Sequence, residues 1–151
     1  MLAVEASTPH LPQDKPRYAM GLGTPPQILE MIARGIDLFD CVLPTRLARH
    51  GTVFTLDGPV HIKGKRFEFD HAPLDPECLH PLTAGFSRAY IRHLFRSGEI
   101  LGLRLICLHN LHFYQSLVRG ARVALEAGTF AAYRAAFLSR YNARTPALSE
   151  P

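Results

Sequence analysis

Residues 17–44, RYAMGLGTPPQILEMIARGIDLFDCVLP, have the pattern of a strand, a helix and a second strand. The segments 17–23 and 36–44 are short apolar runs closed by glycine or proline, which is typical of buried strands. Between them, Thr24 stands at the N-cap position of a helix, just before two prolines, and Gly35 ends the helical stripe. Because the joins are short, the pattern predicts a βαβ unit with two neighbouring parallel strands.

The second apolar run contains one carboxylate, Asp40, and two arginines follow it at Arg46 and Arg49. A buried ionised carboxylate needs a partner, so Asp40 could form an ion pair with Arg46 or another cation. Alternatively, Asp40 could be a nucleophile or base, because ligands of α/β sheets bind beyond the carboxyl ends of the strands. The two arginines could bind phosphate there, or simply be solvated.

The remaining chain changes character after the second strand. Residues 52–69 alternate apolar and polar side chains and break at Asp57-Gly58 and Lys63-Gly64, which predicts a small antiparallel meander. A proline-rich loop is expected over 70–85, followed by helices at about 86–97, 110–127 and 129–142. We expect an irregular lead-in over 1–16 and a disordered tail over 145–151.

Composition limits the class of protein. The 151 residues are 47% hydrophobic, which suits one globular domain, and no apolar run is long enough to span a membrane. The formal charge of +4 permits a polyanionic partner without requiring one. The chain has no recognisable signal peptide, and its three cysteines are too few for a disulfide framework, so we expect a cytoplasmic protein with reduced thiols.

Three metal-capable side chains stand out: Cys78, His80 and His109. A structural zinc site usually has four Cys or His ligands, and Thr83 stands where a C-x-C-x-x-C pattern would have its last cysteine. From the residues alone, either a zinc site or a set of unliganded loop residues is open, and the second is the commoner case.

Several motifs, in order, resemble the C-terminal part of bacterial tRNA-guanine transglycosylases, the enzymes of queuosine biosynthesis. They are KPRYAMGLGTPPQILEMIARGIDLFDCVLPTRLARHG, PLDPEC, SRAYIRHLF, GEILGLRL and HNLHFYQ. The resemblance implies an α/β fold that is part of a (β/α)₈ TIM barrel. Residues 17–144 would supply its last two βα units, a small antiparallel, zinc-type insertion at 52–85, and the C-terminal helices.

The resemblance also implies a glycosyltransferase that exchanges guanine at the tRNA wobble position for queuine or a 7-deazaguanine precursor. Asp40 would be the nucleophile that attacks the ribose C1′ and holds the tRNA covalently. Met20 would pack on the base with Gly21 beside it, while Arg46 and Arg49 would grip the anticodon loop. This chemistry would explain a carboxylate inside an apolar run.

The chain departs from the family at the zinc site. The family's ligands are three cysteines and one histidine, and this chain keeps the first cysteine as Cys78 and the histidine as His109. His80 replaces the second cysteine and can still bind zinc, whereas Thr83 replaces the third and cannot. Zinc binding is therefore left open.

The chain also lacks the N-terminal half of the family's barrel, which carries the general base and most of the strands. We therefore expect it to be inactive alone and to need an N-terminal-half chain. The resemblance further implies a homo- or hetero-oligomer formed through the helix face of Phe86, Tyr90 and His93. The alternatives are a non-catalytic RNA-binding or dimerising paralogue and a truncated, inactive product.

Overall fold

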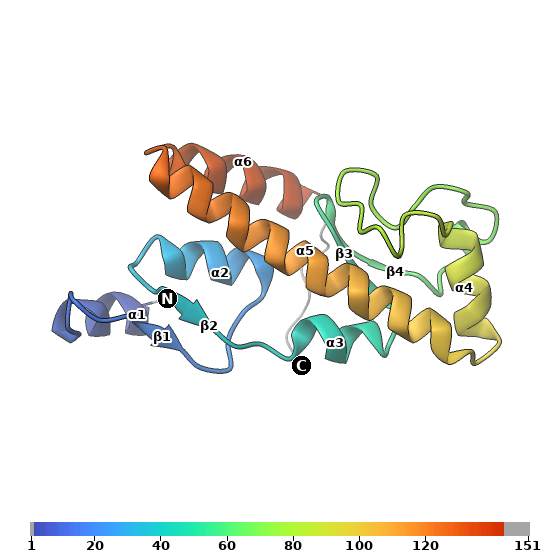
Figure 1. Cartoon of the computed structure of the whole chain (residues 1–151), viewed down its shortest axis with the longest axis horizontal. Coiled ribbons are helices and arrows are strands. Elements are labelled where there is room, and N and C mark those ends of the chain that lie inside the picture. Colours follow the sequence, from blue (N-terminus) through green and yellow to red (C-terminus); the bar gives the residue numbers. More distant parts are fainter. Residues whose placement is uncertain (1, 144–151) are drawn as a thin grey trace.

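The computed structural model describes residues 2–143, which form a mixed α/β fold built around one long helix, α5 (Ile100–Glu126). Figure 1 shows α5 running along the length of the molecule, with α6 (Phe130–Ala143) folded back beside it. One end of the molecule carries α1 (Leu2–Ser7), α2 (Pro25–Ile32) and the sheet of β1 (Tyr18–Ala19) and β2 (Leu38–Phe39). The other end carries a hairpin, a long loop and α4 (Arg88–Arg96).

The predicted βαβ unit is confirmed. Strands β1 (Tyr18–Ala19) and β2 (Leu38–Phe39) are parallel, with Tyr18 opposite Leu38, and α2 (Pro25–Ile32) connects them. Thr24 caps α2 in a capping box: its Oγ1 accepts from the Gln27 N–H at 3.4 Å, and the Gln27 side chain accepts from the Thr24 N–H at 3.0 Å.

The expected burial of both strands is wrong. Tyr18 and Leu38 are 49% and 53% exposed, and the paired segments are much shorter than the apolar runs. Within residues 2–143 the two strands pair only with each other, so no further strand is hydrogen-bonded to either outer edge. Figure 1 shows this small sheet at the periphery, beneath α2.

Helix α3 (Leu43–Ala48) leads into the antiparallel hairpin β3 (Thr52–Thr55) and β4 (Gly58–His61). The hairpin turn falls at the predicted break, where Gly58 has the positive φ of +101° that such a turn needs. The predicted continuation of the meander to residue 69 is wrong. A short 3₁₀ helix, η2 (Lys65–Phe67), forms instead and places Phe67 in the core at 5% exposure.

The three predicted helices are present, but α5 begins at Ile100 rather than near residue 110. Gly102 makes this extension possible, because a Cβ there would lie 3.0 Å from the Leu94 Cβ. The bare glycine thus lets α5 pack closely on α4. The proline-rich segment predicted as a loop at 70–85 has no helix or strand, as expected.

The lead-in is more regular than expected. Helix α1 (Leu2–Ser7) and a 3₁₀ turn, η1 (Thr8–His10), replace the irregular structure expected there, and bends follow over 11–15. Good helix formers such as Leu2 and Ala3 fill α1, and Glu5 reaches α2's end through an ion pair of 2.8 Å with Arg34. The predicted tail over 145–151 lies outside the described residues.

The core has two parts, and α5 contributes to both. The first lies between α2, α5 and α6 and includes Ile28, Leu29, Phe54, Phe113, Tyr114, Leu117, Phe137 and Tyr141. The second lies between α3, the hairpin, α4 and α5 and includes Ala48, Val53, Ile62, Phe67, Leu74, Ile91, Leu105 and Ile106. Among residues 2–143, no helix combines the length and apolar character that a membrane span requires.

Candidate functional site

Asp40 lies immediately after β2, on the surface, where the ends of β1 and β2 meet. Its Oδ1 accepts two hydrogen bonds from the end of β1: one from the Tyr18 hydroxyl at 2.5 Å and one from the Gly21 N–H at 2.8 Å. Gly21 has a φ of +71°, a conformation that glycine adopts without strain, and this turn directs its N–H toward the carboxylate. The parallel pairing of β1 and β2 therefore positions Asp40.

These hydrogen bonds favour the ionised carboxylate. The Tyr18 hydroxyl, and then the Gly21 N–H, hold the pKa of Asp40 below its ordinary value. The same contact raises the pKa of Tyr18. Within residues 2–143, no Lys, Arg or His side chain forms an ion pair with Asp40, so the alternative of an ion pair with Arg46 or another cation is not observed.

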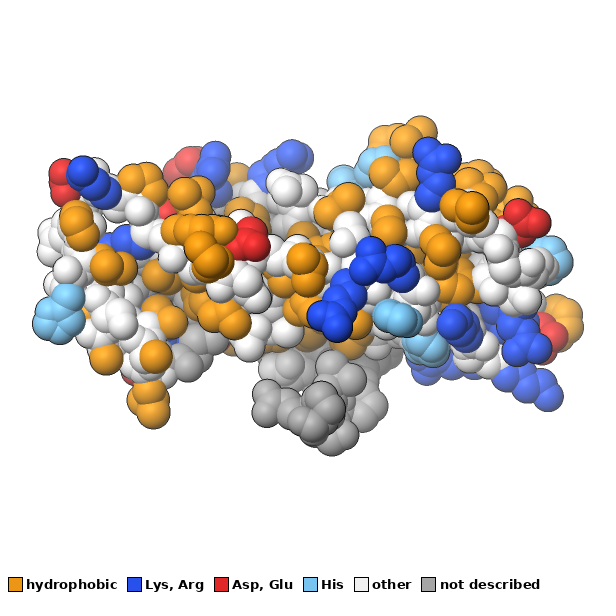
Figure 2. All heavy atoms as spheres, turned by 90° about the horizontal axis from the view of Figure 1, so that it is seen from below, with side chains coloured by type: hydrophobic (Ala, Val, Ile, Leu, Met, Phe, Trp, Pro, Cys, Tyr) orange, Lys and Arg blue, Asp and Glu red, His pale blue; other side chains and the backbone are white. Residues whose placement is uncertain are grey.

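Of the other predicted site residues, Gly21 contacts this carboxylate, whereas Met20 directly precedes Gly21, and Arg46 and Arg49 follow Asp40 in the chain. Met20 and Gly21 lie in the turn after β1, and the Met20 side chain is 75% exposed. Arg46 and Arg49 lie at the end of α3 and are exposed. In Figure 2, Lys, Arg and His side chains gather toward the end of the molecule that holds α3 and α4, beside exposed hydrophobic side chains. A polyanion could approach this face.

Asn110 fixes the segment that follows Asp40, and sequence reasoning missed it. This fully buried side chain donates from Nδ2 to the carbonyls of Pro44 at 2.9 Å and Thr52 at 3.0 Å. Its Oδ1 accepts from the Phe54 N–H at 3.0 Å. One side chain of α5 thus ties the start of α3 to the strand β3. The sequence signal that could have revealed Asn110 was its position as a polar residue on the apolar face of a predicted helix.

We expect Tyr18→Phe to raise the pKa of Asp40, because the variant removes the stronger of the two hydrogen bonds to the carboxylate. Since the native pKa is depressed, ionised Asp40 stabilises the folded chain at neutral pH, and that contribution disappears as the pH falls through the depressed pKa. The variant should lose it at a higher pH. NMR titration of the Asp40 carboxyl carbon measures the shift directly.

Tyr90→Phe is the matched control, because Tyr90 is also an exposed tyrosine but stacks on Phe86, with ring centroids 5.5 Å apart. It should leave the Asp40 titration unchanged. An unchanged Asp40 pKa in Tyr18→Phe would show that the hydroxyl does not hold the carboxylate in solution.

A family profile described as "Queuine tRNA-ribosyltransferase" matches residues 1–143. The chain belongs to this family. The resemblance to tRNA-guanine transglycosylases is thereby confirmed, and so is its restriction to one part of the relatives.

Three relatives illustrate the extent of the match, and each is named queuine tRNA-ribosyltransferase. The protein of Clostridium perfringens (strain SM101 / Type A) is 48% identical over 93% of this chain and 37% of its own length. That of Symbiobacterium thermophilum is 51% identical over 93% and 35%. That of Acidithiobacillus ferrooxidans is 50% identical over 95% and 38%. The chain thus spans little more than a third of these relatives.

The zinc ligands implied by the resemblance are not gathered into a metal site. Cys78 and His109 are buried, while the His80 ring lies edge-on to His112, with centroids 5.2 Å apart. Thr83 is 2% exposed, and its hydroxyl donates to the His80 carbonyl at 3.3 Å. Among residues 2–143, no group of three or more His, Cys, Asp or Glu side chains could hold a metal ion. The side chains present therefore do not fit a four-ligand zinc site.

Proposed function

We propose that this chain is the C-terminal part of a tRNA-guanine transglycosylase and supplies its nucleophile, Asp40. The reaction replaces guanine at the wobble position of tRNA with queuine or a 7-deazaguanine precursor. The observation that carries the proposal is the state of Asp40: an exposed carboxylate with a depressed pKa at the end of a parallel strand, held by Tyr18 and Gly21 rather than by a cation.

The exchange takes place in two displacements at the ribose. An oxygen of Asp40 bonds to C1′ while the bond from C1′ to the guanine nitrogen breaks, and guanine leaves with the electron pair and takes up a proton. A nitrogen of the incoming base then bonds to C1′, loses its proton and returns the carboxylate of Asp40. The target nucleotide has to leave its base stack for C1′ to reach an oxygen on a protein surface.

The neighbouring residues would bind the two parts of the substrate. Met20 is exposed in the turn beside Asp40, where its thioether can pack on the flat face of a base, and Gly21 leaves room next to it. Arg46 in α3 and Arg49 just after it are exposed, and guanidinium groups there can bind anticodon-loop phosphates.

The sheet β1–β2 and the helices α2 and α3 would be the last two βα units of a TIM barrel. A second chain would then supply the other strands, which would cover the exposed Tyr18 and Leu38 and provide the general base. Phe86, Tyr90 and His93 would form an oligomer contact, since Tyr90 is 41% exposed and stacks on Phe86.

The test supplies the missing part as a companion chain, the portion of the C. perfringens relative that this chain does not cover. Labelled guanine should enter tRNA when both chains are present and not with either chain alone. Exchange by this chain alone would contradict the need for a companion. Companion chains from the other two relatives should be tested in the same way. If the chain binds tRNA in a gel-shift assay but no companion chain gives guanine exchange, the non-catalytic RNA-binding alternative is supported instead.

A further inference from the structure

We propose that residues 70–85 fold without a metal ion, and that Asp75 and Arg140 hold this loop at the place where the family resemblance puts the zinc ligands. The proposal concerns the chain's own fold and does not depend on its catalytic activity. It rests on two observations: the donor atoms that zinc would need are incomplete or otherwise engaged, and a separate set of polar contacts fixes the loop.

The donor set lacks a ligand at one of its four positions and has an engaged ligand atom at a second. Thr83 has no thiolate or imidazole, and its buried hydroxyl closes a turn on the His80 carbonyl. The Nδ1 atom of His80 accepts from the Leu82 N–H at 3.2 Å. The Nε2 atom of His109 bonds to the Phe54 carbonyl at 2.8 Å and so joins α5 to β3. Cys78 and the Nδ1 atom of His109 therefore remain as donors, and two ligands do not make a four-ligand zinc site.

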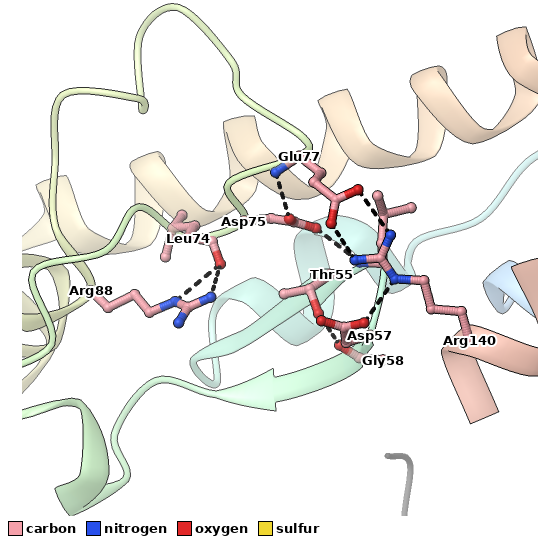
Figure 3. Close-up of polar contacts among 9 residues, drawn as sticks. Thr55, Asp57, Gly58, Leu74, Asp75, Glu77, Arg88 and Arg140 are labelled. Atoms are coloured by element: carbon pink, nitrogen blue, oxygen red, sulfur yellow. Dashed lines mark hydrogen bonds and ion pairs between the residues drawn. The ribbon is translucent and has the colours of Figure 1, made fainter. Parts of the chain in front are cut away.

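Asp75 provides the buried anchor of the loop. This carboxylate is 4% exposed, and its two oxygens accept from different backbone groups: Oδ2 from the Leu56 N–H at 2.8 Å, and Oδ1 from the Glu77 N–H at 3.0 Å. Leu56 lies in the hairpin turn, so Asp75 ties the loop to the hairpin (Figure 3). A buried carboxylate is stable only with such donors, and here both oxygens have one.

Arg140 adds a second tie from α6. Its Nη1 and Nη2 atoms donate to the two oxygens of Glu77, at 3.0 and 2.5 Å, and its Nε donates to Asp57 at 2.8 Å. Figure 3 shows the guanidinium lying between the two carboxylates, one on the loop and one in the hairpin turn. Exposed ion pairs usually add little to the stability of a fold. A bidentate arginine in a network of carboxylates is the case in which they do add stability.

Arg88 fixes the loop from the α4 side. Its Nε and Nη2 donate to the Leu74 carbonyl at 3.2 and 3.0 Å, and its Nη1 donates to Asp70 at 3.1 Å. Leu74 itself is in the core at 2% exposure. The loop is thus held by contacts from α4, the hairpin and α6.

The first experiment measures metal content. Chain expressed with added zinc and then dialysed should hold far less than one zinc per chain, and a chelator should leave its melting temperature unchanged. The variant His80→Cys/Thr83→Cys, which restores the three-cysteine set, should bind about one zinc per chain and show thiolate charge-transfer absorption with Co²⁺. One zinc per unaltered chain, or a chelator-dependent melting temperature, would overturn the proposal.

The second experiment tests the contacts by limited proteolysis. Asp75→Ala should speed cleavage within residues 70–85 about tenfold, and the milder surface variant Arg140→Gln about threefold, with or without zinc. Asp14→Ala and Arg104→Gln, which change exposed residues elsewhere, should leave the rate unchanged. Unchanged cleavage in both loop variants would show that these contacts do not hold the loop.

Discussion

Asp40→Asn is expected to reduce guanine exchange by the two-chain enzyme by roughly 10³-fold or more. An amide is a very poor nucleophile, so the bond to the ribose C1′ does not form. The substitution changes no bulk, and the Gly21 N–H and Tyr18 hydroxyl can still bond to the amide oxygen. The tRNA binding that we propose for Arg46 and Arg49 should therefore persist, and the loss should appear in kcat rather than in the affinity for tRNA.

Asp37→Asn is the matched control. Asp37 is another exposed aspartate just before β2, but its carboxylate accepts from the Arg17 N–H at 2.8 Å and lies before the strand rather than after it. This variant should keep exchange within a few-fold of the unaltered enzyme.

Trapping gives a second and independent readout. The unaltered enzyme, denatured during turnover, should carry tRNA on the peptide that contains Asp40, and the Asp40→Asn variant should carry none. Full exchange by the variant, or an adduct on any other residue, would overturn the assignment of the nucleophile.

Asn110→Ala is expected to lower the free energy of unfolding by roughly 3 kcal/mol. The substitution leaves the Phe54 N–H and the carbonyls of Pro44 and Thr52 without their partner inside the protein. It also opens a small cavity where the fully buried side chain had been. Denaturant unfolding followed by circular dichroism measures the change.

Two further variants separate hydrogen bonding from other effects. Asn142→Ala removes an exposed asparagine near the end of α6 and should change the unfolding free energy by less than about 0.5 kcal/mol. Asn110→Asp keeps the shape but turns oxygen lone pairs toward the two carbonyls, so it should also be strongly destabilising. A cost below about 1 kcal/mol for Asn110→Ala would mean that these three bonds are readily replaced.

The sequence predicted those parts of the fold that are determined by local signals. Thr24 before two prolines marks the start of α2, and Asp57-Gly58 marks the hairpin turn, because caps and turns depend on a few adjacent residues. The parallel order of β1 and β2 follows from the short connections around one helix.

The errors arose where distant contacts decide the outcome. The predicted third strand is absent because Phe67 packs into the core, and the early turns of α5 pack on α4, where Gly102 lies against Leu94. The strands of the βαβ unit were expected to be buried, but their exposure depends on which other strands are present in the chain.

The candidate site was predictable only in part. Asp40 stood out because an acid in an apolar run is unusual, and its role came from the resemblance. Its partner Tyr18 could not be found from spacing, since the contact depends on the register of β1 against β2. Asn110 and Asp75 were missed for the same reason: their partners lie far away in the sequence.

The long helix α5 limits where residues can be inserted into or deleted from this chain. Its Leu105 and Ile106 belong to one core, and its Phe113, Leu117 and Ala121 belong to the other. The rotation of this one helix therefore orients the residues of both cores. One residue inserted between Ile106 and Phe113 would turn everything after it by about 100°. The α5 side chains of one core could then stay buried, but those of the other could not. Insertions and deletions should therefore be confined to the connecting loops.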